Sequence, residues 1–132
     1  VTRTLPMADG EVLYKLMGQI AADVHDDAPA LSALAGDCVA IGHWMLKDAS
    51  LDDRLAGSVP FCTMCAVTIA GWQLMRQVKA IEAGESPALA ATKPVTARFF
   101  VHHVVSETAG WRGPAMAGAE LLYALTTEQL AG

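Results

Sequence analysis

Two cysteines, Cys62 and Cys65, lie three positions apart in the apolar stretch 60–72. This C-x-x-C spacing serves thiol redox chemistry, iron–sulfur ligation and zinc binding. It is equally compatible with two small apolar side chains on a buried helix, because free cysteine is among the most buried residue types. The surrounding sequence therefore has to decide whether the pair is reactive or structural.

The redox interpretation lacks its usual surroundings. In thioredoxin-like proteins the attacking cysteine begins a helix after a β-strand, where the helix dipole stabilises the thiolate. No strand-like alternation precedes Cys62, and a helix that begins at Ser58 would place this cysteine a turn inside. The all-helical AhpD-like peroxidases carry a histidine one turn after their second cysteine, and Ile69 occupies that position here.

A zinc site would need ligands from three different helices. Three sulfurs and one nitrogen are available in principle, from Cys38, Cys62 and Cys65 with His43, His102 or His103. No second local pair supports this, and adjacent histidines on a helix point about 100° apart. We therefore interpret the cysteines as buried apolar residues, with a stand-alone thiol-redox or zinc-binding protein as the alternative. An odd number of cysteines fits the reducing cytoplasm.

Composition limits the possible partners. The net charge of −5 and the scattered lysines and arginines argue against nucleic-acid binding. Hydrophobic residues make up 53% of the chain. With glycine counted and tyrosine left out the share is about 60%, against a usual ~45–50%. Such a composition predicts self-association or packing against a neighbouring domain.

The stretch 55–75 carries no charge, but Gly57, Pro60 and two threonines, Thr63 and Thr68, interrupt it. A membrane span needs ~20 predominantly apolar residues, so we expect a core helix here and no membrane partner. The first residue is Val1, which predicts a processed chain or a piece of a larger one.

Helical periodicity runs through the whole chain. The first expected helix begins at an Asp9 cap and ends near 25–27, and the second begins at Pro29. Their apolar stripes are Leu13, Leu16, Met17, Ile20 and Val24, and Leu31, Leu34, Cys38, Ile41 and Met45. Residues 47–58 break this periodicity and are predicted to form a connection between the second and third helices.

The third expected helix is capped by Ser58 and ended by Gly84, although a start near Leu51 with a kink at Pro60 is an open alternative. The fourth begins at Ser86-Pro87 and runs through 88–109, with Pro94 interrupting its first turns. After a break at 110–114, a short last helix carries Leu121, Leu122 and Leu125. The pattern predicts one all-α domain over residues 1–132, an antiparallel bundle of four main helices plus a short C-terminal helix.

Two stretches, "AGSVPFCTMCAVTIAGWQLMRQVKAIEAG" (56–84) and "ATKPVTARFFVHHVVSETAG" (91–110), carry a recognisable pattern. A small residue pair is followed by Pro and an aromatic, then Gly-Trp, then Lys, and then Ala-Arg with two aromatics. This pattern resembles the acetyl-CoA-dehydrogenase-like C-terminal domain of the long acyl-CoA dehydrogenase subgroup, which includes the methylmercaptopropionyl-CoA dehydrogenases. The signature residues are Pro60, Phe61, Gly71, Trp72, Lys93, Ala97, Arg98, Phe99 and Phe100.

The resemblance implies a C-terminal helical accessory domain of a larger flavoenzyme. Such enzymes use FAD and a glutamate base to remove hydrogens from the α and β carbons of an acyl-CoA thioester. No catalytic, cofactor-binding or metal residue can be assigned here, so the chain is expected to be inactive alone and to bind no FAD itself. Its expected partners are the catalytic domains of the parent chain and a second subunit, as a homodimer. Cys62, Cys65 and Pro94 depart from the family pattern.

The segment Ala97-Arg98-Phe99-Phe100 suits a helix buried on two sides. Adjacent aromatics on a helix point about 100° apart, so one ring can enter the core while the other faces a second surface. The stem of Arg98 can cover apolar surface while its guanidinium seeks a partner. We therefore expect this helix to border an interface. The alternative is that both rings fit one core.

Overall fold

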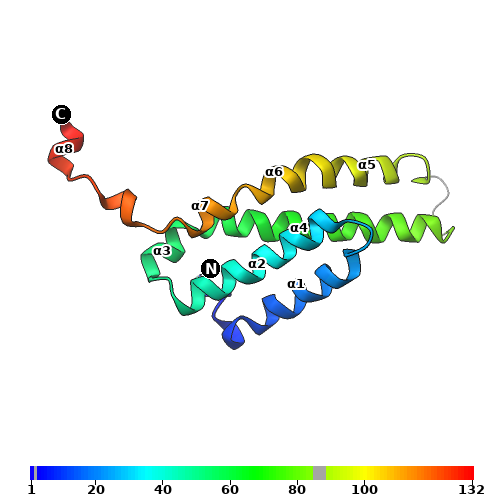
Figure 1. The fold of residues 1–132 in the computed structure, drawn as a ribbon, viewed down its shortest axis with the longest axis horizontal. Helices are drawn as coiled ribbons and strands as arrows, with labels where there is room; N and C mark the ends of the chain where they lie inside the picture. Colours follow the sequence, from blue (N-terminus) through cyan, green and yellow to red (C-terminus); the bar gives the residue numbers. More distant parts are fainter. Residues whose placement is uncertain (2, 85–88) are drawn as a thin grey trace.

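The structure is a computed structural model that describes residues 1, 3–84 and 89–132, and every regular element in these residues is a helix. Figure 1 shows an elongated bundle with a C-terminal extension. The elements are η1 (Met7–Gly10), α1 (Glu11–Val24), α2 (Pro29–Lys47), α3 (Leu51–Ala56), α4 (Ser58–Glu82), α5 (Lys93–Phe99), η3 (Phe100–Val105), α6 (Ser106–Ala109), α7 (Arg112–Met116), η4 (Glu120–Tyr123) and α8 (Thr127–Ala131).

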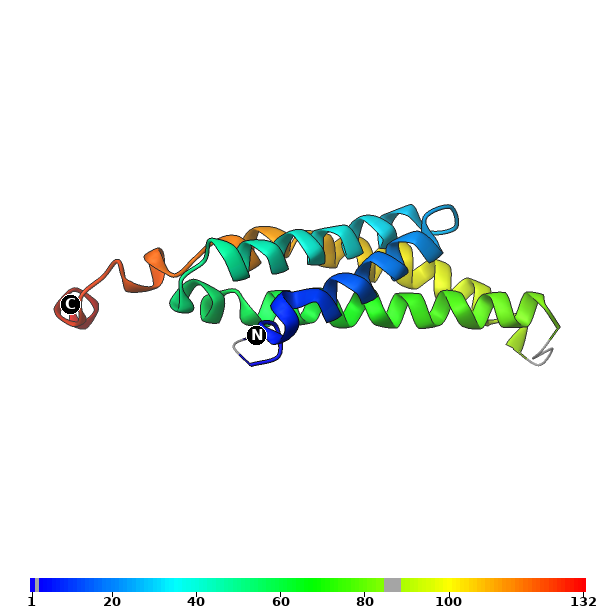
Figure 2. The same cartoon turned by 90° about the horizontal axis from the view of Figure 1, so that it is seen from below.

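Four long helical bodies form the bundle: α1, α2, α4, and the continuous run α5–η3–α6 (Figures 1 and 2). The predicted all-α fold class is confirmed. Helix α2 packs against α1, α4, η3 and α7, and α4 packs against every other long body. The α1–α2 turn is short, with buried Ala28 just before Pro29 at the first helical position, where its fixed φ suits a helix start.

The core follows the predicted stripes of α1 and α2. Leu31, Leu34, Cys38, Ile41 and Met45 of α2 are all at most 1% exposed. From α1, Met17, Ile20 and Val24 face them, while Leu13 and Leu16 pack at the edge, half-buried. Periodicity alone therefore identified the buried faces of these two helices.

The start of α1 differs from the prediction. Asp9 does not cap the helix: it lies in the short 3₁₀ segment η1, and Gly10 is the N-cap. Ala8 and Asp9 both have positive φ, 50° and 52°, and Gly10 follows at 81°. These three left-handed residues turn the chain before the helix begins, and the N-cap Gly10 has no side chain to accept a hydrogen bond from the first N–H groups.

The predicted connection 47–58 contains a helix, α3. Ser50 and Asp53 form a capping box at its start, a signal that the sequence carried in Ser-x-x-Asp. Ser58 was wrongly assigned as a cap, because Gly57 is the N-cap of α4 and the Ser58 hydroxyl donates back to the Leu55 carbonyl at 2.8 Å. Pro60 lies in the first turn of α4, as predicted.

Helix α4 ends at Glu82, and Gly84 follows in the left-handed conformation with φ 82°, as expected for a helix stop. One face packs against the other helices, while Cys62, Ala66 and Ala70 are exposed. Among the described residues, α4 is the one helix long and apolar enough to cross a membrane. The core helix of a soluble bundle meets the same criteria.

The fourth body starts later than predicted, at Lys93. Pro94 therefore lies in the first turn of α5, where proline is tolerated, and does not interrupt the helix interior. The predicted start at Ser86-Pro87 lies outside the described residues. In the middle of this body, Phe100–Val105 form a π-helical segment. Such segments often occur at functional positions.

The C-terminal region was predicted only in outline. The break is confined to Gly110 and Trp111, and α7 occupies most of the expected gap. Leu121 and Leu122 lie in the 3₁₀ segment η4, and Leu125 precedes α8. All three are exposed, so they do not belong to the bundle core.

Candidate functional site

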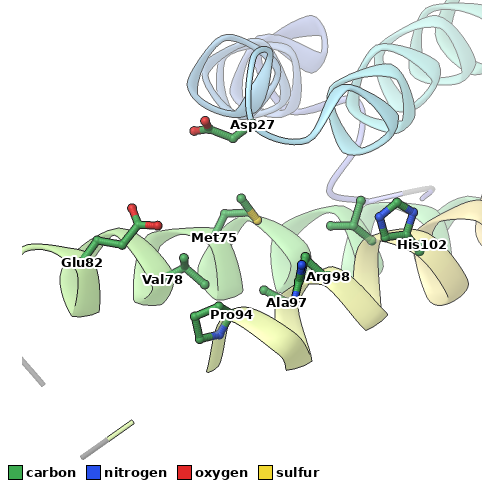
Figure 3. A pocket seen from close by; sticks show the side chains of 9 residues that line it. Asp27, Met75, Val78, Glu82, Pro94, Ala97, Arg98 and His102 are labelled. Atoms are coloured by element: carbon green, nitrogen blue, oxygen red, sulfur yellow. The ribbon is translucent and has the colours of Figure 1, made fainter. Parts of the chain in front are cut away.

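A cleft in the described residues lies between the α1–α2 turn, the C-terminal half of α4, and the α5–η3 body. Its volume is about 430 Å³. Figure 3 shows Arg98 and His102 on the α5–η3 side, with Asp27 across the cleft on the α1–α2 side. The lining residues are Asp27, Met75, Val78, Glu82, Pro94, Ala97, Arg98, Val101 and His102.

The floor of the cleft is apolar because helical spacing aligns small and apolar residues from both bodies. Met75, Val78 and Glu82 recur at i, i+3 and i+7 along α4, which places them on one helix face. Ala97 is only 3% exposed, and its short side chain lets α5 approach α4 closely. The polar side chains of the lining are those of Asp27, Glu82, Arg98 and His102.

The rim carries charges of both signs. Lys79 Nζ lies 3.1 Å from Asp27 Oδ2, which ties α4 to the α1–α2 turn. Arg98 has no ion pair within the described part of the chain. The arrangement offers an apolar floor, with a guanidinium and an imidazole on the α5–η3 side, the Asp27 carboxylate on the α1–α2 side and the Glu82 carboxylate on α4 (Figure 3). It suits an amphipathic group or a neighbouring side chain, and it pairs no nucleophile with a base.

Two glycines of the family pattern permit close packing. A Cβ on Gly71 would lie 2.8 Å from Leu31 Cδ1 and 3.3 Å from Phe100 Cε1, so α2 and η3 meet α4 at this glycine. A Cβ on Gly57 would clash with the backbone carbonyl of Ala115, so α7 reaches the start of α4 only because Gly57 lacks one.

The aromatic signature residues have different environments. Phe61 is buried in the core beside half-buried Pro60. The Trp72 indole Nε1 donates to Asp23 Oδ2 at 3.0 Å, and the Arg76 guanidinium lies 5.1 Å from the centre of the Trp72 ring. The hydrogen bond joins α4 to α1, and the contact with Arg76 lies within α4.

Phe99 and Phe100 diverge as expected. Phe100 packs against the core, whereas Phe99 is 60% exposed and stacks on His103 with ring centres 4.4 Å apart. Lys93 is half-buried at the first turn of α5 and does not line the cleft, and of the signature residues only Ala97 and Arg98 do.

Comparison with known protein families identifies the family of this chain. The family described as "Acetyl-CoA dehydrogenase C-terminal like" matches residues 13–126, which is most of the chain. The chain belongs to this family. No curated protein and no solved structure matches the chain. The acyl-CoA dehydrogenase C-terminal resemblance is therefore confirmed at the level of the family.

The described residues of this family member do not fit the FAD that the resemblance implies for the parent enzyme. The cleft beside Arg98 is lined by the carboxylates of Asp27 and Glu82 as well as by one guanidinium, and two carboxylates disfavour the diphosphate of FAD. A second cleft, near the N-terminus, has a lining without any cationic side chain. No step of flavin chemistry is therefore assigned to these residues.

The cysteines are distributed differently from the prediction. Cys38 is buried and Cys65 half-buried, but Cys62 is exposed, so its assignment to the core is wrong. The side of α4 that carries Cys62 is not covered by α2, α7 or the fourth body. Cys38 Sγ lies 3.7 Å from Thr68 Oγ1. A hydrogen bond with Cys38, followed by burial, raises the pKa of the Cys65 thiol and keeps it protonated.

The histidines are also dispersed. His43 stacks on Tyr14 with ring centres 4.0 Å apart, His103 stacks on Phe99, and His102 lines the cleft. Within the described ranges, no three histidine, cysteine or acidic side chains are grouped so that they could hold a metal ion. The structure thus brings Cys38 and Cys65 together but leaves Cys62 and the histidines apart.

Sequence reasoning singled out Ala97, Arg98 and Pro94 but missed the other side of the cleft. Met75, Val78 and Glu82 share a helix face, and that periodicity was the available signal. The sequence did not indicate that these residues share a cleft with Asp27, because that depends on how the α1–α2 turn lies over α4.

Proposed function

We propose that this chain is the C-terminal helical accessory domain of a FAD-dependent acyl-CoA dehydrogenase. The parent is of the long subgroup that includes the methylmercaptopropionyl-CoA dehydrogenases, and it acts in the cytoplasm. The observation that carries this proposal is the family match over residues 13–126. The domain contributes packing and subunit contacts, while α,β-dehydrogenation of the acyl-CoA takes place in other domains of the parent.

The exposed side of the fourth body supports the packing role. Val95 and Phe99 lie one helical turn apart and are 56% and 60% exposed. Large apolar side chains in such positions mark surfaces that meet another protein. In the parent, this face meets the catalytic domains.

The cleft beside Arg98 supports the same role. A guanidinium that has no ion pair among the described residues and lies above an apolar floor is suited to bind an acidic side chain of a neighbouring domain, because arginine pairs well with carboxylates at interfaces. A residue of the catalytic domains seated there would hold the accessory domain in one orientation.

The test compares the longer gene product with the 132-residue chain alone. The coding sequence upstream of Val1 is expected to encode flavin-binding domains. The full protein is expected to be yellow and to oxidise acyl-CoA with an electron acceptor, and the 132-residue chain to be colourless and inactive. A purified 132-residue chain that keeps a flavin colour through gel filtration would overturn the proposal, as would an upstream sequence without such domains.

A further inference from the structure

The last part of the chain forms an arm, defined here as residues Glu120–Gly132, which leaves the bundle near α3 and extends beyond it (Figures 1 and 2). Five large apolar side chains on this arm are between 58% and 85% exposed, namely Leu121, Leu122, Tyr123, Leu125 and Leu130. The arm therefore presents an apolar surface that its own bundle does not cover.

The arm has a defined start and a defined end. At its root, the Ala119 N–H donates to Asp53 Oδ1 at 2.8 Å, and Ala119 itself is buried. Near its end, a capping box between Thr126 and Gln129 begins α8, with the Thr126 N–H donating to Gln129 Oε1 at 2.8 Å. These contacts give the arm local structure and a fixed point of departure.

The accessible surface of the chain is too large for a compact monomer. A monomer of 13.9 kDa is expected to expose about 6,700 Å². The chain exposes 8057 Å², roughly 1,400 Å² more. A standard protein interface buries about 800 Å² per partner. The excess surface is thus sufficient for a stable interface.

An apolar cleft of about 250 Å³ lies between the N-terminal segment, α1 and the start of α4. Among the described residues that line it, the side chains other than Thr4 and Cys62 are apolar, and Met7 and Val12 are largely exposed. The N-terminal segment lies toward the end of the bundle from which the arm departs (Figures 1 and 2). The cleft and the root of the arm therefore share one end of the molecule.

We propose that the arm of one copy packs its leucine side chains into the N-terminal cleft of a second copy, and that the second copy returns the same contact. Since the arm extends away from its own bundle, the cleft it fills belongs to another molecule. A reciprocal exchange about a twofold axis buries both arms and closes the assembly at two copies. This dimer does not depend on the flavoenzyme context of the proposed function.

The first test measures association of the 132-residue chain by sedimentation over a concentration series. The triple variant Leu121→Ser, Leu122→Ser, Leu125→Ser is expected to weaken dimerisation by roughly tenfold or more, because apolar anchors dominate such interfaces. On the cleft side, Val12→Ser is expected to act in the same direction. All four side chains are exposed, so circular dichroism should show an unchanged fold.

The matched control is Val95→Ser with Phe99→Ser, which removes exposed apolar groups from the fourth body and not from the arm. This control is expected to leave dimerisation unchanged. A dimer that survives the arm variant but is lost in the control would overturn the proposal. A strictly monomeric chain at high micromolar concentration would also overturn it. The catalytic domains of the parent would then be the partner that covers the arm.

A second test uses the exposed Cys62 at the cleft as a native reporter. Leu122→Cys is expected to give an interchain disulfide to Cys62 under mild oxidation by a copper–phenanthroline catalyst with oxygen, identified by peptide mass. Adding Cys62→Ser should abolish this crosslink. Crosslinking that persists without Cys62, or that maps only between two arms, would contradict the exchange.

Discussion

The Trp72 indole nitrogen donates a 3.0 Å hydrogen bond to Asp23 Oδ2, which joins the middle of α4 to the last turn of α1. Lys79, two turns further along α4, reaches the neighbouring α1–α2 turn through Asp27 at 3.1 Å. Both contacts are solvent-exposed, so each contributes modestly, and together they set how α1 lies across α4.

Trp72→Phe removes the indole donor and keeps an aromatic ring. We expect the free energy of unfolding to fall by about 0.5–1.5 kcal/mol, the usual net contribution of one hydrogen bond. Trp111→Phe is the matched control, because none of the described side-chain hydrogen bonds involves the Trp111 indole, and its effect should be near zero. Urea unfolding measures both, and equal effects would argue against the Asp23 contact.

Gly71→Ala and Gly18→Ala test the close packing at α4. Both glycines lie inside helices, but a Cβ at Gly71 would press on Leu31 and Phe100, while Gly18 has open space. We expect Gly71→Ala to destabilise by about 1–3 kcal/mol through overpacking. Gly18→Ala should stabilise by up to about 1 kcal/mol because alanine favours helix. Thermal and urea unfolding of both variants decide this, and a neutral Gly71→Ala would contradict the packing.

Asp53 makes the root of the arm sensitive to acid. The Ser50 hydroxyl donates to Asp53 Oδ2 at 2.7 Å, and the Ala119 and Ser50 N–H groups also donate to the carboxylate. These bonds, that of the Ser50 hydroxyl first, lower the pKa of Asp53. A lowered folded pKa means stabilisation that is present above the ordinary pKa of about 3.9 and is lost as pH falls through the folded value.

Asp53→Asn should therefore loosen the arm root at neutral pH and reduce the loss of stability in acid. Asp52→Asn is the matched control, one residue away, exposed and without a hydrogen bond among those described. Carboxyl titration by NMR and unfolding as a function of pH measure the effect. An Asp53 carboxyl that titrates at its ordinary pKa would contradict the prediction.

The three thiols should react in a fixed order. Exposed Cys62 is expected to label rapidly under native conditions, Cys65 slowly, and buried Cys38 only on unfolding. Correspondingly, Cys62→Ala should be nearly neutral, and Cys38→Ala should cost about 1–3 kcal/mol through lost burial and a small cavity. Mass spectrometry of the labelled chain and urea unfolding give the result. Fast native labelling of Cys38 would show that the core is more open than described.

The sequence by itself determined the all-α class, the buried stripe of α2, the stop at Gly84 and the divergence of Phe99 and Phe100. Each of these depends on neighbours within one or two helical turns, where geometry is set by 3.6 residues per turn and by the φ preferences of glycine and proline. The family signature was readable for the same reason, because its residues mark close helix contacts at fixed spacings.

Only the tertiary structure decided which faces of these helices are covered. Cys62 is as apolar as Cys38, yet it is exposed, because the neighbours of α4 occupy the side of Phe61, Met64, Thr68 and Gly71. The cleft beside Arg98 joins α4 to a turn almost fifty positions earlier, and the arm extends away from the core despite its leucines. Periodicity assigns residues to a shared face, but burial of that face depends on which other elements pack there, and local sequence does not encode that arrangement.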